Sequence, residues 1–217
     1  MNDRLLIIGA GGHGKVVADI AMKMNIWDKI AFLDDDESIK TCMAIDVIGK
    51  SEDALKYKDD SDLFVAIGNN FTREKIQENL QTIGASIATL IHPSAILGTD
   101  VMINKGTAIM AGVVINCSSR IGKGCIINTA ASLDHDCVIE DYAHLSPGVR
   151  LSGTVNIGKS TWLGIGSIVG NNIGIAFDCI IGAGAVVIKD ITESGTYVGV
   201  PARMISQRDP KQWRDCP

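Results

Sequence analysis

The sequence has no excess of positive charge, and this limits the partners that it is suited to bind. Its 217 residues include 20 Lys and Arg against 25 Asp and Glu, which gives a formal net charge of −5 at pH 7 and a pI near 5.3. Proteins that bind nucleic acid or an anionic membrane without sequence preference gather basic side chains for that purpose. We therefore expect neither nucleic acid nor a membrane as a partner, and we favour a small molecule.

The chain also lacks a long apolar run near its start. Residues 5–8 form an apolar run that is far shorter than the roughly 20 residues of a membrane-spanning helix. No basic segment followed by a cleavable apolar stretch precedes this run. We expect a cytoplasmic protein.

Paired cysteines are missing as well. The cysteines show no CxxC pair and no spacing typical of metal ligands, and they are Cys42, Cys117, Cys125, Cys137, Cys179 and Cys216. In a reducing compartment such residues behave as small apolar side chains. We expect no metal.

What the sequence does contain is a repeat of six residues between positions 91 and 187. One aliphatic residue recurs in every hexad, at Ile91, Leu97, Ile103, Ile109, Ile115, Ile121, Ile127, Leu133, Ile139, Leu145, Leu151, Ile157, Leu163, Val169, Ile175, Ile181 and Val187. The position four residues later is small or β-branched, and the position directly after the aliphatic residue is often Gly or Asn. A period of six is typical of a parallel β-helix built from hexapeptide repeats, in which three hexads close one triangular coil. We expect this domain over 91–205, followed by a polar C-terminal tail over 206–217.

Residues 1–90 carry a different pattern, in which short apolar strands alternate with helices. The expected strands cover 4–8, 29–33, 62–67 and 86–91, and the expected helices cover 15–24, 51–57 and 72–82. Alternation of this kind predicts an α/β domain with a small Rossmann-like parallel sheet.

A glycine-rich turn joins the first strand of this domain to its first helix. Gly9, Gly11 and Gly14 match the spacing GxGxxG, and Asp34 and Asp35 close the next strand. Glycines let a ligand approach the backbone closely, and the N–H groups at a helix start favour phosphate. Ligands of such sheets lie across the carboxyl ends of the strands. The residues expected to bind a ligand there are Gly11, Gly12, His13, Asp34, Asp35 and Gly68.

The most polar run within the repeat covers residues 128–136. Neither His135 nor His144 occupies an interior position of its hexad, so both should face outward near corners. A carboxylate that accepts a hydrogen bond from one imidazole nitrogen raises the basicity of the other, as a general base near pH 7 requires. Asp134 and Asp136 both flank His135, and the sequence does not decide which of them acts.

Several stretches resemble the hexapeptide-repeat acyltransferases with a left-handed parallel β-helix. They are the repeated frame aliphatic-Gly-x-x-small-x, INTA at 127–130, LDHDCVI at 133–139 and VGVPA at 198–202. Together with the turn at 9–14, FLDD at 32–35 and AIGNN at 66–70, they resemble one subfamily. It contains UDP-N-acetylbacillosamine N-acetyltransferases, GDP-perosamine N-acetyltransferases and sialic acid O-acetyltransferases. The resemblance extends over about residues 4–205.

The resemblance implies a homotrimer with active sites between protomers, acetyl-CoA in a groove between neighbouring prisms, and a nucleotide-activated amino sugar on the N-terminal domain. The general base of the family falls on His135, and the carboxylate that raises its basicity falls on Asp136. Bacillosamine-type enzymes have Glu at that second place, and Asp also suits the sialic acid group. Family contacts to acetyl-CoA fall on His144, Gly153, Ile165 and Ala183. Asn128 sits where a polar residue could orient the acceptor or the thioester.

The activity implied is an acetyl-CoA-dependent N-acetyltransferase. Its acceptor would be the 4-amino group of a UDP-linked 4-amino-4,6-dideoxy sugar, used for bacterial surface glycan or glycoprotein synthesis. The amine attacks the thioester directly while His135 removes its proton. The first alternative is an O-acetyltransferase acting on sialic acid or a related sugar, and the second is a GDP-perosamine-type N-acetyltransferase.

Two hypotheses of a different functional class also rest on the glycine turn. In one, the chain is a nucleotide-binding or regulatory module and the prism is only a scaffold. In the other, the chain is an NAD-dependent dehydrogenase, which GxGxxG alone supports. The roughly ninety residues ahead of the repeat allow only about half of a doubly wound dinucleotide fold.

Overall fold

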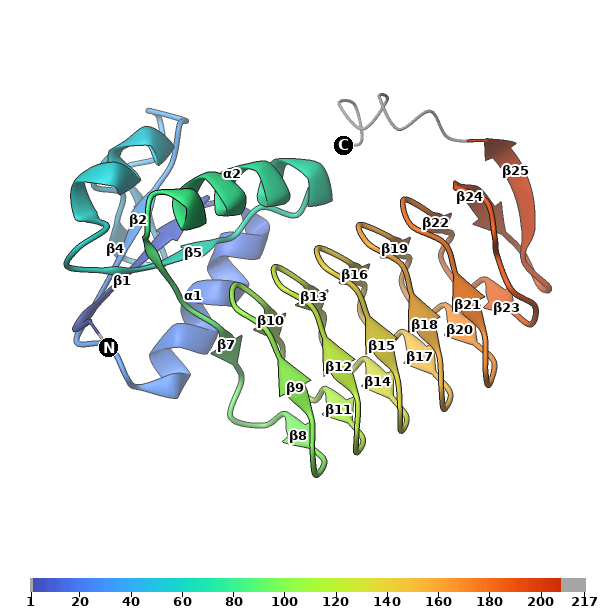
Figure 1. Cartoon of the computed structure of the whole chain (residues 1–217). Helices are drawn as coiled ribbons and strands as arrows, with labels where there is room; N and C mark the ends of the chain where they lie inside the picture. The colour runs from blue at the N-terminus through green and yellow to red at the C-terminus, as the bar shows by residue number, and fades with distance from the viewer. Residues whose placement is uncertain (1, 208–217) are drawn as a thin grey trace. The chain divides into compact units, whose positions relative to one another are not determined.

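The computed structural model describes residues 2–207 of the chain (Figure 1). The chain forms two compact units that divide between Pro93 and Ser94. In the described range, no helix is both long enough and apolar enough to cross a membrane.

The first unit is built on a parallel sheet with the strand order β2-β1-β5-β6. The strands are β1 (Arg4–Ile8), β2 (Lys29–Leu33), β5 (Asp62–Val65) and β6 (Ser86–Ile87). The helix α1 (Gly12–Met24) packs against β1, and α2 (Asn70–Thr82) packs against β5. Buried side chains from strands and helix, including Leu6, Leu33, Leu63 and Leu80, form one core. The predicted Rossmann-like parallel sheet is confirmed.

The boundaries of the other elements of this unit differ from the prediction by a few residues. α2 begins at Asn70 because Asn69 caps it, with its Oδ1 accepting a hydrogen bond from the Thr72 N–H at 2.9 Å. The predicted last strand is two short strands, β6 and β7 (Leu90–Ile91). The predicted helix over 51–57 is a 3-10 helix, η1 (Ser51–Tyr57).

A hairpin of two short strands, β3 (Thr41–Cys42) and β4 (Ile45–Asp46), was not predicted. Met43 and Ala44 join its strands, and both have positive φ, 53° and 61°. Turns of this kind normally carry Asn or Gly. The sequence therefore gave no turn signal at this place.

Two glycines of the turn after β1 are required by packing. Gly9 has φ +104°, and a Cβ on Gly14 would lie 2.0 Å from the carbonyl oxygen of Gly9. α1 can approach the end of β1 this closely only with glycine at position 14. Gly11 and Gly12 differ, since a Cβ on either would meet no atom within 4 Å. These two glycines leave open space at the start of the helix.

The second unit is a parallel β-solenoid with three faces (Figure 1). Ala108 pairs with Ile126, and Ile126 pairs with His144, so 18 residues make one coil as predicted. Face 1 contains β10 (Ala108–Ile109), β13 (Ile126–Ile127), β16 (His144–Leu145), β19 (Trp162–Leu163), β22 (Ile180–Ile181), β24 (Gly195–Val198) and β25 (Arg203–Gln207). Face 2 contains β8 (Ile96–Leu97), β11 (Val114–Ile115), β14 (Ser132–Leu133), β17 (Arg150–Leu151), β20 (Ile168–Val169) and β23 (Val186–Val187). Face 3 contains β9 (Met102–Ile103), β12 (Arg120–Ile121), β15 (Val138–Ile139), β18 (Asn156–Ile157) and β21 (Gly174–Ile175).

The predicted interior of the solenoid is confirmed by burial. The repeated aliphatic side chains from Ile109 to Val187 are at most 4% exposed. Leu97 is 38% exposed, because the first coil stacks on a further coil of the solenoid on one side only. The small position is buried as well from Thr107 to Ala185, and the hydroxyls of Thr107, Ser119 and Thr161 link coils. Thr107 Oγ1, for example, donates to the Gly122 carbonyl at 2.7 Å and accepts from the Cys125 N–H at 3.0 Å.

Three cysteines of the repeat are buried like small apolar side chains, as predicted, and a fourth is not. Cys125, Cys137 and Cys179 are free and fully buried at the small position. Cys117 is free and exposed. Cys216 lies outside the described residues.

Every corner of the solenoid turns through a residue in the left-handed conformation. Positive φ recurs at each sixth residue from Asp100 to Gly184, and Asp136 is one of these, with φ +58°. The residue just before this bend stands at the corner, and residues 18 apart stack in a column. The column between faces 2 and 3, called the His135 column, contains Thr99, Cys117, His135, Gly153 and Asn171. The column between faces 1 and 2, called the Ile165 column, contains Ala111, Thr129, Pro147, Ile165 and Ala183.

The described chain ends in an antiparallel pair of strands, β24 and β25. Ser206 and Gln207, the first two residues of the predicted polar tail, belong to β25. The rest of that tail lies outside the described residues.

Candidate functional site

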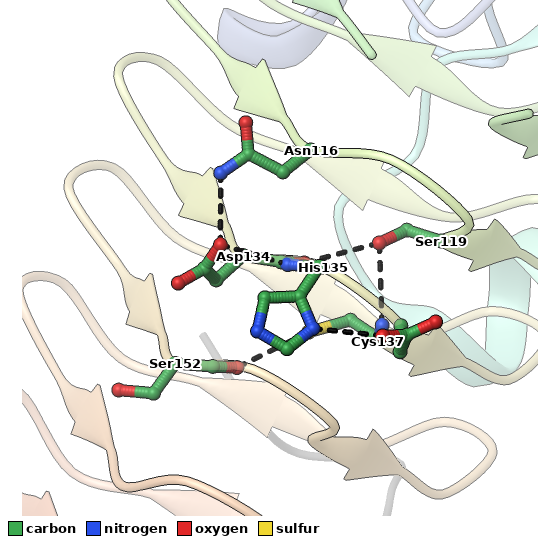
Figure 2. A network of polar contacts seen from close by, with 7 residues as sticks. Asn116, Ser119, Asp134, His135, Cys137 and Ser152 are labelled. Carbon is green, nitrogen blue, oxygen red and sulfur yellow. Dashed lines mark hydrogen bonds and ion pairs between the residues drawn. The ribbon is translucent and has the colours of Figure 1, made fainter. Parts of the chain in front are cut away.

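His135 stands at the corner between β14 and β15, where the chain passes from face 2 to face 3 (Figure 2). Its Nδ1 lies 2.7 Å from Asp136 Oδ2, and both side chains are more than half exposed. A carboxylate at Nδ1 keeps the proton of the neutral imidazole on that nitrogen. Nε2 therefore carries the free lone pair and is the basic atom of the ring.

Asp134 makes different contacts. Its Oδ1 accepts hydrogen bonds from Asn116 Nδ2 and from the backbone N–H of His135, both at 2.9 Å (Figure 2). Asn116 belongs to the preceding coil, so the Asp134 carboxylate links the backbone of His135 to that coil. Of the two carboxylates that the sequence left open, Asp136 is the one that contacts the ring.

Both carboxylates raise the pKa of His135. The hydrogen bond with Asp136 is the largest cause, partial loss of solvent opposes it, and the negative charges of Asp134 and Asp136 add to the increase. The hydrogen bonds from Asn116 and from the His135 N–H lower the pKa of Asp134. A carboxylate with a lowered pKa is ionised at neutral pH, so Asp134 keeps its charge beside the imidazole. The two carboxylates therefore make His135 a stronger base.

Gly153 lies in the next coil of the His135 column, against the other side of the ring. A Cβ on Gly153 would be 2.6 Å from His135 Nε2 and 2.7 Å from Cε1. Its backbone N–H makes no hydrogen bond with any described residue. The basic nitrogen therefore lies against a residue whose backbone donor is available.

The other residues expected to contact acetyl-CoA lie elsewhere on the solenoid. On face 1 the His144 ring stacks on Trp162, with ring centroids 5.8 Å apart and an interplanar angle of 11°. Asn128 Nδ2 lies 3.4 Å from His144 Nε2. Ile165 and Ala183 follow face 1 in the Ile165 column, and both are exposed.

One chain does not bring these two groups together. In a prism with three faces, the corner between faces 2 and 3 lies opposite face 1. His135 and Gly153 belong to that corner, while His144 and Asn128 belong to face 1. A site that uses both groups needs the His135 corner of one chain and face 1 of another.

In the first unit, the loops after β2 and β1 are tied together at the carboxyl ends of the strands. Asp34 Oδ2 accepts from the Ala10 N–H at 2.6 Å, and Asp34 Oδ1 accepts from the Asp36 N–H at 2.9 Å. Asp35 Oδ1 accepts from the Ser51 N–H at 2.9 Å. Asp34 thus holds the glycine turn through Oδ2 and its own loop through Oδ1, while Asp35 ties that loop to Ser51 at the start of η1.

His13 lies in the first turn of α1. Burial, followed by the positive charge of Arg73, lowers the pKa of His13 to about 4, so the ring is neutral at pH 7. Its Nε2 is buried and has no hydrogen-bond partner among the described residues. Arg73 donates to the carbonyls of Ile67 and Gly68, at 2.9 and 3.0 Å. Because buried polar atoms are normally paired, Nε2 marks a place where a ligand can supply the partner.

Sequence reasoning missed Asn116, Trp162 and Arg73. The repeat could have revealed the first two, because Asn116 stands 18 residues before Asp134 and Trp162 pairs with His144 in the next coil. Arg73 gave no such signal, since its helix position does not show that the side chain is fully buried. Over residues 2–207, no three His, Cys, Asp or Glu side chains are grouped so as to hold a metal ion.

Comparison with known sequences matches one family model and several acetyltransferases. Residues 4–80 match the family described as the PglD N-terminal domain. Over 114 residues the chain is 38% identical to UDP-N-acetylbacillosamine N-acetyltransferase of Bacillus subtilis (strain 168), a match that covers 48% of this chain and 50% of that protein. The chain thus spans about half the length of the curated relatives it matches.

Solved structures match over almost the whole chain. The acetyltransferase domain of PglB from Neisseria gonorrhoeae FA1090 is 37% identical with a TM-score of 0.91, and the match covers 94% of this chain and all of that one. The same domain has been solved with acetyl coenzyme A. A mutant of perosamine N-acetyltransferase from Caulobacter crescentus, solved with CoA and GDP-perosamine, is 38% identical with a TM-score of 0.89 and covers 94% of this chain and 97% of that one.

Proposed function

Because this chain belongs to the hexapeptide-repeat sugar acetyltransferases, the family of the PglB acetyltransferase domain, we propose that it acetylates the 4-amino group of a UDP-linked 4-amino-4,6-dideoxy sugar with acetyl-CoA. The product serves the synthesis of a bacterial surface glycan or glycoprotein. Support comes from the likeness to the PglB domain, which binds acetyl-CoA, and from the partial likeness to an enzyme named for a UDP-sugar.

The observation that carries the proposal is the pair formed by His135 and Asp136. Nδ1 is engaged by the carboxylate at 2.7 Å, so Nε2 accepts the proton of the sugar amine as the nitrogen attacks the thioester carbon. Asp136 stabilises the imidazolium that forms. The carbon–sulfur bond then breaks, and the sulfur leaves as the thiolate of CoA, which takes up a proton. No covalent intermediate on the protein is required.

Gly153 supplies the second element of the reaction. As the amine adds, negative charge develops on the carbonyl oxygen, and a backbone N–H aimed at that oxygen stabilises it. The N–H of Gly153 is available, because it bonds to no described residue, and a Cβ on the same residue would lie 2.6 Å from Nε2. Base and oxyanion donor therefore come from consecutive coils of one corner.

The acetyl-CoA groove is formed by two chains in this proposal. The stacked rings of His144 and Trp162, with Asn128 beside them, offer a partly buried aromatic and polar surface. Ile165 and Ala183 extend it along the neighbouring corner. Because His135 lies at the opposite corner of its own prism, the base must come from an adjacent protomer. This supports a homotrimer with active sites between protomers, and a monomeric chain would be inactive.

The nucleotide part of the acceptor is assigned to the first unit. Gly11 and Gly12 leave open backbone at the N-terminus of α1, which favours a phosphate group. The unpaired Nε2 of neutral His13 offers one hydrogen-bonding atom to the same ligand. The proposal assigns Asp35 and Gly68 to the same ligand, and Asp34 supports it by fixing the turn through its bond to the Ala10 N–H.

A GDP-linked 4-amino sugar is the second candidate acceptor. It is favoured by the match to perosamine N-acetyltransferase, which covers 94% of this chain at 38% identity. The match to the UDP-sugar enzyme covers about half as much. The two candidates differ in the nucleotide and share the base, the thioester and the attacking amine.

The test is release of CoA thiol from acetyl-CoA in the presence of three acceptors: a UDP-linked 4-amino-4,6-dideoxy sugar, a GDP-linked 4-amino sugar and free sialic acid. Rapid release with the UDP-sugar is expected. His135→Ala should lower turnover by roughly 10² to 10⁴, the usual contribution of a general base, while acetyl-CoA binding measured by calorimetry stays nearly unchanged. Asn171→Ala, an exposed change in the same column, is the matched control and should leave turnover unchanged.

Other outcomes redirect the proposal. Release with the GDP-sugar alone would identify the second candidate. Release with sialic acid alone would replace N-acetylation by O-acetylation. Full turnover by His135→Ala would remove this residue from the mechanism.

A further inference from the structure

Gly153 is the glycine that lies against the imidazole of His135. A Cβ at this position would be 2.6 Å from Nε2, 2.7 Å from Cε1 and 3.3 Å from Cδ2, and these are the three nearest atoms. A Cβ does not approach a heavy atom of another residue as closely as 2.6 Å without a steric clash. The observed position of the ring therefore depends on the absence of a side chain at residue 153.

The fold itself does not require glycine at this position. Gly153 is not among the residues with positive φ, so its backbone conformation suits any L-residue. Its place in the hexad, two residues after the aliphatic, otherwise carries side chains of every size. These are Thr99, Lys105, Ala111, Cys117, Lys123, Thr129, His135, Asp141, Pro147, Lys159, Ile165, Asn171, Phe177 and Ala183.

Other glycines of the solenoid meet a different kind of obstacle. A Cβ on Gly158 would lie 2.5 Å from the backbone nitrogen of Phe177, and one on Gly164 would lie 2.7 Å from the backbone nitrogen of Ala183. Those glycines let one coil stack on the next, and a side chain there would push the coils apart. At Gly153 the obstacle is the free end of a rotatable side chain. Gly153 is also buried, whereas Cys117 and Asn171 of the same column are exposed.

We propose that Gly153 is a positioning residue for His135: the space left by its missing side chain receives the imidazole and holds Nδ1 within reach of Asp136. The ring is then fixed from two sides. The carboxylate of Asp136 engages Nδ1. The backbone of Gly153, in the next coil, lies against the edge of the ring that carries Nε2. This role adds to the donor role of the Gly153 N–H and rests on the proposed function only where turnover is concerned.

Two coils supply the groups recorded around the ring. Its own coil contributes the carboxylates of Asp134 and Asp136, and the next coil contributes the backbone of Gly153. Loss of the contact with Asp136 removes the largest cause that raises the pKa of His135.

The experiment is Gly153→Ala, with Gly174→Ala as the matched control. A Cβ on Gly174 has no neighbour closer than Asp190 Oδ1 at 3.9 Å, so that change should alter neither the ring nor turnover. In Gly153→Ala the ring should rotate away at little cost in stability. A titration of His135 followed by NMR in the protein without ligands should then show its pKa falling toward the ordinary value. Turnover should fall roughly tenfold to a hundredfold, as expected for a misplaced catalytic group, with an unchanged melting temperature.

The outcomes separate positioning from the other roles of the site. An unchanged titration of His135 in Gly153→Ala overturns the proposal, and a fall in turnover without that shift would assign Gly153 to substrate contact alone. Failure of Gly153→Ala to fold would also overturn it, because the fold would then need the glycine. A shifted titration in a protein that acetylates none of the tested sugars would uphold the positioning role while the proposed function fails.

Discussion

The two units of this chain hold their functional residues in opposite ways. In the first unit the proposed ligand-binding residues lie on loops that follow different strands, and specific contacts hold these loops together, such as Asp34 on the Ala10 N–H. In the second unit one geometry repeats at every corner, and chemistry arises where a corner departs from it by carrying His135 above Gly153. A unique loop must be built from many specific contacts. A repeated corner needs only the right residue types at a few of its positions.

The two units also shift the pKa of their histidines in opposite directions. Burial lowers the pKa of His13 to about 4, which keeps a neutral ring that can exchange hydrogen bonds with a ligand. Carboxylates at an exposed corner raise the pKa of His135, which makes a base. The first unit tunes its histidine by removing water, and the second by adding charge.

The largest expected effect comes from breaking the stacked interior of the second unit. Ile139→Asp places a carboxylate where the side chain is 1% exposed, with no partner inside the prism. The cost of burying such a charge is several kcal/mol, so the solenoid should be unfolded or strongly destabilised in urea unfolding monitored by circular dichroism. Ile168→Asp, on an outward side chain that is 44% exposed, is the control. Equal stability of the two variants would contradict the assignment of the interior.

A smaller effect is expected from the glycine turn of the first unit. Gly14→Ala would set a Cβ 2.0 Å from the Gly9 carbonyl oxygen, and overpacking of this kind costs about 1 to 3 kcal/mol. Gly11→Ala meets open space and should keep the free energy of unfolding while weakening nucleotide-sugar binding. Thermal unfolding together with calorimetric titration of the nucleotide separates the two effects. Loss of stability in both variants would remove the distinction between packing and ligand-binding glycines.

The pH dependence of stability should sharpen the contrast between the histidines. Because His13 has a folded pKa of about 4 against an ordinary value of 6.5, the unfolded chain binds the extra proton between these values. The free energy of unfolding should therefore fall as the pH is lowered from 6.5 to 4, by up to about 3 kcal/mol. Urea unfolding at several pH values tests this, and His13→Gln should flatten the slope.

His135 should act with the opposite sign on stability. Its raised pKa stabilises the folded state below the ordinary value, and this contribution is lost as the pH rises through the folded value. The effect is small because the side chain is 53% exposed. A slope that persists unchanged in His13→Gln would assign the acid sensitivity to other groups.

The smallest predicted effect distinguishes the two carboxylates at the catalytic corner. Asp136→Asn removes the largest cause that raises the pKa of His135, so the acid limb of the kcat/KM profile should move to lower pH. The plateau should fall about tenfold, because a weaker base accepts the proton less readily. Asp134→Asn should shift the same limb less, since Asp134 acts on the ring only through its charge. A larger shift from Asp134→Asn would reverse the assignment of the two residues.

The fold was predictable from the sequence because the repeat constrains it at every sixth residue. The aliphatic register from Ile109 to Val187 fixed the interior, and the pairing of residues 18 apart followed from it. The first unit was predictable where strands carry apolar runs. The hairpin at Met43 and Ala44 was not, because positive φ there has no Gly or Asn to mark it.

The site was predictable in part, and the reason is physical. Neighbours along one column follow from the period, so Gly153 beneath His135 and Trp162 beside His144 were within reach of the sequence. Which carboxylate turns toward the ring depends on backbone conformation at Asp136, and a flanking pair of Asp residues does not encode it. The unpaired nitrogen of His13 depends on burial between loops that are distant in sequence.

Because one coil takes 18 residues, the number of residues ahead of a position decides on which edge of the prism it lies. Six residues added ahead of His135, at any corner, would rotate everything after them by a third of a revolution and carry the imidazole to a different edge of the prism. Eighteen added residues would return it to the same edge, displaced along the axis by one strand spacing of about 4.8 Å. An insertion in the solenoid therefore both rotates and shifts the residues after it. Only insertions of 18 residues or a multiple of 18 keep His135 on the same edge of the prism.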